Sequence, residues 1–92
     1  MKIKKGYVLK EMKSVSETVS VVVAVGEAAK NLNGYLTLNE SGLIVWKALE
    51  KGATESDIVA AILNEYDVSE EVAANDVAAV IKTLKSIGAI DD

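Results

Sequence analysis

The chain has 92 residues, half of them apolar, with neither histidine nor cysteine and a formal net charge of −4. This length suits one domain with one hydrophobic core, and the two missing residue types are those most used as general bases, thiol nucleophiles and zinc ligands. No apolar run reaches the roughly 18 residues of a membrane span and no signal peptide is recognisable, so we expect a cytoplasmic, non-catalytic domain without metal, cofactor or membrane contact.

Three strands are predicted in the first half of the chain. Residues 18–25, TVSVVVAV, are rich in the β-branched residues that favour strands, and a weaker strand over residues 7–13 is joined to them by a polar turn. Residues 26–33 have the composition of a loop, and the turn pair Asn33–Gly34 precedes a short strand over Tyr35–Leu38. We therefore predict a three-stranded antiparallel meander, with the strands paired in sequence order.

Three helices are predicted in the second half. The first runs from about Glu40 to Lys51, directly after the N-cap residue Asn39. The second begins at Thr54–Asp57, a capping-box pattern in which aspartate replaces the usual glutamate. The third is capped by Ser69, is followed by two glutamates that suit the positive end of the helix dipole, and ends at Gly88.

Apolar residues at helical spacing indicate which sides of these helices face the core. The single tryptophan, Trp46, is expected to anchor the core from the first helix. The inward stripe expected for the third helix consists of Ala73, Val77, Val80, Leu84 and Ile87.

The order of the elements indicates an α+β fold in which a three-stranded antiparallel sheet precedes three helices, as in winged helix-turn-helix proteins. Charge argues against nucleic acid as a partner. In residues 1–13, five lysines and one acidic residue give +4, but in residues 14–92 five lysines and thirteen acidic residues give −8. The third helix, which would enter the major groove, begins Ser-Glu-Glu and includes Asp76, and the chain has no arginine to contact guanine.

The most distinctive segment is Tyr-Leu-Thr-Leu-Asn-Glu-Ser-Gly over residues 35–42, followed by Trp46. Together with later segments it resembles the PqqD family, whose members are also called RiPP recognition elements, and the resemblance covers nearly the whole chain. Val80 departs from the family pattern, which often has a larger residue there, and Ala89-Ile90 replaces an ending that more commonly contains leucine. The later matching segments are Glu65-Tyr-Asp-Val-Ser, Asp76-Val77, and Leu84 before Gly88-Ala-Ile90.

The resemblance implies a single domain over residues 1–92 that binds the leader region of a ribosomally made precursor peptide. Family members present this peptide to a maturation enzyme, often a radical SAM protein, which here would be a separate chain. The leader adds a strand to the edge of the third strand and packs against the third helix, which agrees with the unpaired backbone groups that any edge strand offers. The candidate peptide-binding residues are Tyr35, Leu36, Thr37, Leu38, Val72, Asp76, Ala79, Val80 and Thr83.

Alternative interpretations of the same residues stay open at this point. Leu36, Leu38 and Val80 fit the hydrophobic core better than they fit a ligand contact, because apolar residues at structural spacing usually pack inward. The alternatives for the whole chain are a winged-helix nucleic-acid-binding module and a structural module that forms a homodimer through the same sheet edge.

Overall fold

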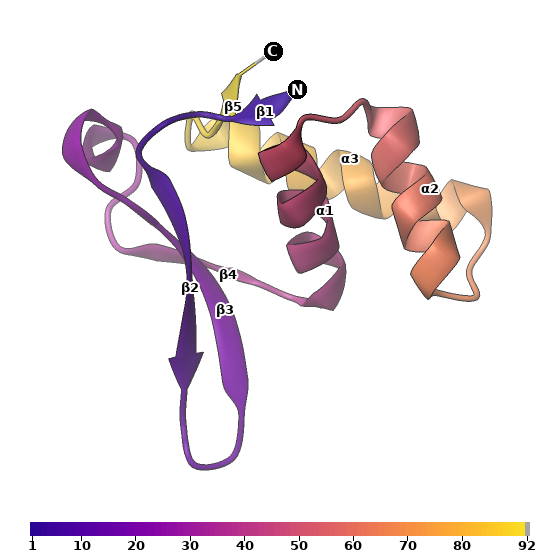
Figure 1. Cartoon of the computed structure of the whole chain (residues 1–92), viewed down its shortest axis with the longest axis horizontal. Helices are drawn as coiled ribbons and strands as arrows, with labels where there is room; N and C mark the ends of the chain where they lie inside the picture. The colour runs from indigo at the N-terminus through magenta and orange to yellow at the C-terminus, as the bar shows by residue number, and fades with distance from the viewer. Residues whose placement is uncertain (92) are drawn as a thin grey trace.

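The computed structural model describes residues 1–91, and the predicted α+β, winged helix-turn-helix-like fold is confirmed (Figure 1). Three helices lie together beside a three-stranded sheet. None of the helices formed by residues 1–91 combines the length and the apolar character of a membrane span. The elements in chain order are β1 (Lys2–Ile3), β2 (Tyr7–Lys13), β3 (Thr18–Ala24), the 3-10 helix η1 (Gly26–Lys30), β4 (Tyr35–Leu38), α1 (Glu40–Lys51), α2 (Glu55–Glu65), α3 (Glu70–Ser86) and β5 (Ile90–Asp91).

Strands β2, β3 and β4 form an antiparallel sheet in that order, as predicted. Strands β2 and β3 pair along their whole length, and their hairpin projects away from the helices (Figure 1). Strand β4 pairs with the central part of β3, from Ser20 opposite Leu38 to Val23 opposite Tyr35. This order leaves β4 at one edge of the sheet, immediately before α1.

Two features of the fold differ from the sequence-based expectation. The short strands β1 and β5 were not predicted, and they pair as a second antiparallel sheet with Ile3 opposite Ile90. Residues 26–30, expected to be a loop, form the 3-10 helix η1, which buries Ala28 against the core. Both features depend on contacts with distant parts of the chain, because segments of two to five residues carry no periodic pattern of their own.

The three predicted helix caps are all present. The side chain of Asn39 accepts a hydrogen bond from the backbone N–H of Gly42 at 2.8 Å. Thr54 and Asp57 form a complete capping box, and Ser69 accepts a hydrogen bond from the first turn of α3. Each such cap stabilises its helix by about 1 kcal/mol. The cap at Asn39 also fixes the point where the edge strand β4 turns into α1.

The core lies between the sheet and the helices, with Trp46 fully buried in α1 as predicted. Helix α3 differs from the predicted inward stripe at two positions, because Val80 and Ile87 are only half-buried. Ile81, which was not predicted to face the core, is 3% exposed. Ile81 lies four residues after Val77 and Val80 only three, and a step of four is closer to the 3.6 residues of a helical turn. Val80 therefore lies at the margin of the core.

Candidate functional site

One free edge of the sheet lies along β4, as the sequence predicted, and the other lies along β2. Strand β4 pairs with β3 on one side, and no strand of residues 1–91 pairs with its other side. Leu36 is half-buried and Leu38 is buried, whereas Tyr35 and Thr37 are exposed. The predicted alternation, with the two leucines toward the helices and Tyr35 and Thr37 outward, is confirmed.

The predicted flank of α3 lies at the surface. Val72, Asp76, Ala79 and Thr83 are all exposed, and the half-buried Val80 lies between this flank and the core. The hydroxyl of Thr83 donates a hydrogen bond to the carbonyl oxygen of Ala79 at 3.1 Å, so it is already paired within the helix. The flank therefore offers small and apolar surface rather than free polar groups, with Asp76 as the exception.

A cavity of about 360 Å³ connects this flank with the end of β4. Asp76 lines it from α3, and Asn39 lines it from the position directly after β4. The structure thus brings one predicted site residue together with the strand end. The complete lining is Asn39, Glu40, Ser41, Ile62, Tyr66, Val68 and Asp76.

Most of this lining was not predicted as part of a site. Ile62 lies on the buried face of α2 and is 1% exposed. Tyr66 is only half-buried, because it is the C-cap residue of α2, where the helix ends beside the start of α1. The sequence signal that could have indicated a surface location is the position of Tyr66 directly after the last residue of α2.

The cavity contains a hydrogen bond between two elements that are distant in sequence. The hydroxyl of Tyr66 donates to Oε2 of Glu40 at 3.1 Å. Partial burial raises the pKa of Tyr66, and the hydrogen bond to Glu40 and the negative charges of Glu40 and Glu65 raise it further. The phenol therefore stays protonated near neutral pH and remains a donor to the carboxylate.

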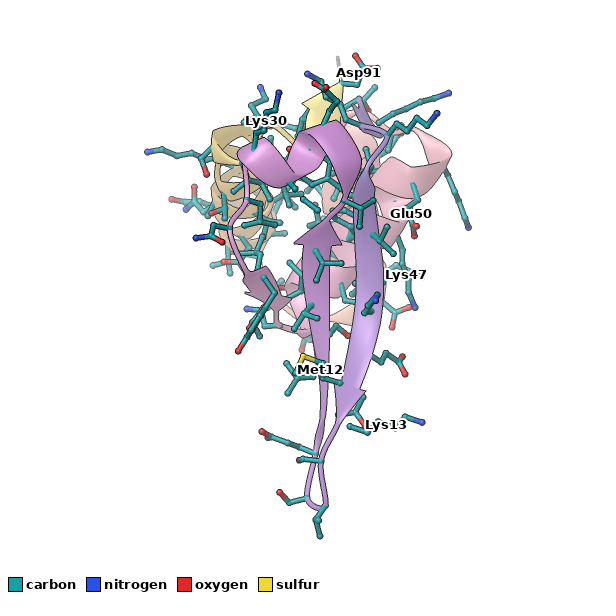
Figure 2. The ribbon with its side chains drawn as sticks, turned by 90° about the vertical axis from the view of Figure 1, so that its left-hand side faces the viewer. Met12, Lys13, Lys30, Lys47, Glu50 and Asp91 are labelled. Atoms are coloured by element: carbon teal, nitrogen blue, oxygen red, sulfur yellow. The ribbon has the colours of Figure 1, made fainter. Side chains whose placement is uncertain are left out.

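A second hollow, of about 390 Å³, lies on the opposite face of the sheet and contains the other predicted strand residues. Tyr35 and Thr37 line it together with residues of the β2–β3 hairpin, including Met12 and Val21. Figure 2 shows Met12 on the lower part of this hairpin, well below η1. The predicted site residues are therefore divided: the β4 leucines pack toward the helices, whereas Tyr35 and Thr37 face the other side of the sheet.

Comparison with protein-family models gives one match. The model of the family described as Coenzyme PQQ synthesis protein D (PqqD) matches residues 17–90, from the turn of the β2–β3 hairpin into β5. Comparison with curated proteins gives no significant match.

Comparison with solved structures gives two similar folds. The first, described as TbiB1 in complex with the TbiA(beta) leader peptide, is 23% identical and has a TM-score of 0.75. The structural match covers 100% of this chain and 100% of that one. The second, described as lasso peptide synthetase B1 complexed with the leader peptide, is 22% identical with a TM-score of 0.63, covering 91% of this chain and 95% of that one. At this level of identity the two structures establish the architecture.

Proposed function

Because the chain belongs to the PqqD family, we propose that it is a non-catalytic binder of the leader region of a ribosomally made precursor peptide. The leader adds an antiparallel or parallel strand to the free edge of β4 and packs against the exposed flank of α3. The domain, residues 1–92, then presents the peptide to a separate maturation enzyme of the radical SAM class in the cytoplasm. Nucleic acid is not a partner in this proposal.

The observation that carries the proposal is the free backbone edge of β4. Along an edge strand, the N–H and C=O groups of alternate residues point away from the sheet. A peptide strand pairing with these groups would gain about 0.5–1.5 kcal/mol for each hydrogen bond. This recognition uses backbone groups, so it does not depend on the side chains of Tyr35 and Thr37, which face away from α3.

The flank of α3 supplies the second surface that such a peptide needs. A strand added to a sheet lies about 4.8 Å from its neighbour and directs alternate side chains to one face. On the helical face these side chains would meet Leu36 and Leu38 below and Val72, Ala79 and Val80 at the side. Apolar side chains of the leader would fit there, because Ala79 is small and Val80 is only half-buried.

The two similar structures support the proposal, since each was solved with a leader peptide according to its description. The composition supports the non-catalytic part, because a chain without histidine or cysteine lacks the commonest general bases and thiol nucleophiles. The acidic surface supports a protein or peptide partner over nucleic acid.

The direct test is an NMR titration of the isotope-labelled chain with the leader of a precursor encoded next to it. We expect shifts in the amides of Tyr35–Leu38 and in those of α3 around Asp76–Thr83. Shifts confined to the opposite face of the sheet, around Met12 and Val19, would contradict the proposed site.

A backbone scan of the bound peptide tests strand addition itself. Methylating one peptide nitrogen at a time removes one donor without changing a side chain. Strand pairing predicts that affinity falls at every second position, because alternate amides point toward β4. A uniform profile would argue for binding by side chains alone. In a separate measurement of oligomeric state, a dimer that persists at saturating peptide would assign the β4 edge to self-association.

A further inference from the structure

We propose that the cavity at the end of β4 binds a lysine or arginine side chain of the peptide, so that the domain selects leaders with a basic residue at one fixed position. This inference rests on the proposed function, because it assigns a specificity to the same binding edge.

The cavity has the composition that a long cationic side chain requires. Val68 and the ring of Tyr66 provide apolar surface, with Ile62 buried behind them, and Glu40 and Asp76 provide two carboxylates. Lysine and arginine bury their aliphatic stems against apolar groups and keep the charged head next to polar ones. A volume of about 360 Å³ is at the lower end of small-molecule sites, enough for one side chain rather than a whole cofactor.

The negative charge of the cavity is not neutralised by the protein itself. No lysine lines it, and across residues 1–91 the one ion pair is between Lys30 and Glu27, on η1. The pKa of Tyr66 is raised by partial burial first and then by the hydrogen bond to Glu40 and the charges of Glu40 and Glu65, which agrees with the carboxylates that line the cavity.

An anionic guest is disfavoured although the cavity adjoins the N-terminus of α1. Asn39 already accepts the N–H of Gly42 at 2.8 Å and the hydroxyl of Ser41 at 3.1 Å, so these donors are occupied. Glu40 in the first turn also supplies the negative charge that the helix dipole attracts. A second anion would be repelled by Glu40 and Asp76.

The cavity is continuous with the proposed peptide path. It begins at Asn39, one residue beyond the last residue of β4, and no residue of β2 or β3 lines it. In Figure 1, β4 leads into the lower end of α1, beside the lower end of α2 where Tyr66 follows. A strand along the free edge of β4 would therefore bring one or two of its side chains over the cavity as it passes Leu38 and Asn39.

The test uses a display library of random linear peptides selected on the whole immobilised chain at low ionic strength. The wild-type chain should enrich peptides with apolar residues and with lysine or arginine at one fixed offset from them. The double variant Glu40→Gln/Asp76→Asn should lose this basic preference, and should bind wild-type-selected peptides roughly fivefold more weakly, as for partly exposed ion pairs.

The matched control is the double variant Glu50→Gln/Glu71→Gln, which removes the same charge from exposed positions of α1 and α3 outside the cavity. This control should keep the preference for a basic residue. In the test variant, Glu40→Gln retains an acceptor for the Tyr66 hydroxyl, so we do not expect unfolding to cause its loss of preference. Enriched peptides without a fixed basic position, or equal effects of the two double variants, would overturn the cavity proposal alone. Selected peptides that bind an Ala79→Trp variant undiminished would overturn the peptide site of the proposed function itself.

Discussion

The hydroxyl of Tyr7 donates a hydrogen bond to the carbonyl oxygen of Ile87, which joins the first residue of β2 to the C-cap of α3. The side-chain amide of Asn31 donates to the same hydroxyl at 3.4 Å. Tyr7 is 8% exposed, so its hydroxyl makes these hydrogen bonds at the margin of the core. The sheet and the end of the helix that walls the proposed binding groove are thus held together by one phenol.

Replacing Tyr7 by phenylalanine should therefore destabilise the chain. The ring is kept, but the Ile87 carbonyl and the Asn31 amide lose a partner, which we expect to lower the free energy of unfolding by about 1–2 kcal/mol. Urea denaturation followed by Trp46 fluorescence measures this. The control is Tyr35→Phe, at a residue 59% exposed, which should change stability little. Equal losses in both variants would show that the Tyr7 hydroxyl contributes nothing specific.

Filling the groove from α3 should block peptide binding without unfolding the domain. Ala79 and Ala78 are both exposed on α3 but lie on different flanks, and only Ala79 adjoins Val80 and Thr83 on the proposed wall. We expect Ala79→Trp to weaken leader binding at least about tenfold by steric exclusion, and Ala78→Trp to bind as the unmodified chain does. Isothermal titration with the leader peptide distinguishes the two variants. A stronger effect of Ala78→Trp would show that the peptide binds the other flank of α3.

The Tyr66–Glu40 contact predicts a pH dependence of stability in the alkaline range. The raised pKa of Tyr66 means that the folded chain holds the phenol proton more tightly than the unfolded chain does. The resulting stabilisation is complete below the unfolded pKa of about 10 and is lost as pH rises through the higher folded value.

The free energy of unfolding should therefore fall more steeply between about pH 9 and pH 12 in the unmodified chain than in Tyr66→Phe. Lysine titration is common to both proteins, so the difference between the two curves isolates Tyr66. Parallel curves would mean that the contact with Glu40 is not maintained in solution.

Two glycines with similar positive φ angles separate steric crowding from backbone strain. Gly6 has φ of +100° and Gly34 has φ of +96°, a region that residues with a side chain rarely adopt. A Cβ on Gly6 would lie 2.8 Å from the Cβ of Ala28, whereas a Cβ on Gly34 would meet nothing within 4 Å.

Alanine at either position should cost about 1–2 kcal/mol from the backbone alone. Gly6→Ala should cost about 1–3 kcal/mol more, because η1 must move to relieve the contact with Ala28. Thermal unfolding of the two variants gives the comparison. If Gly34→Ala proved as destabilising as Gly6→Ala, the packing of η1 against Gly6 would not be a source of stability.

The elements that sequence patterns predicted correctly are those specified by local chemistry. The caps at Asn39, Thr54 and Ser69 and the β-branched run of β3 each act within a few residues, so they can be recognised without the fold. The pairing of β1 with β5 was missed, because each of these two-residue strands forms only by pairing with the other, at the far end of the sequence.

The candidate site was predictable only in part for the same reason. The alternation of Leu36 and Leu38 with Tyr35 and Thr37 follows from strand geometry, and the edge position of β4 follows from the pairing order. The cavity forms where the start of α1, the end of α2 and the middle of α3 meet, so its lining depends on how three helices pack. Among its residues, Asp76 alone had been singled out as a site residue.

The pairing of Lys2 with Asp91 means that the strands and helices could be connected in a different order along the chain. It holds β1 and β5 side by side (Figure 1), so a short linker could connect them while new ends are cut at the exposed turn around Val15. In such a circular permutant β1 and β5 would become a local hairpin, whereas β2 and β3 would become the most distant pair in the sequence. The permutant should reach the same fold with the same free β4 edge, but more slowly, because the most extensive strand pairing would then require closure of the longest loop.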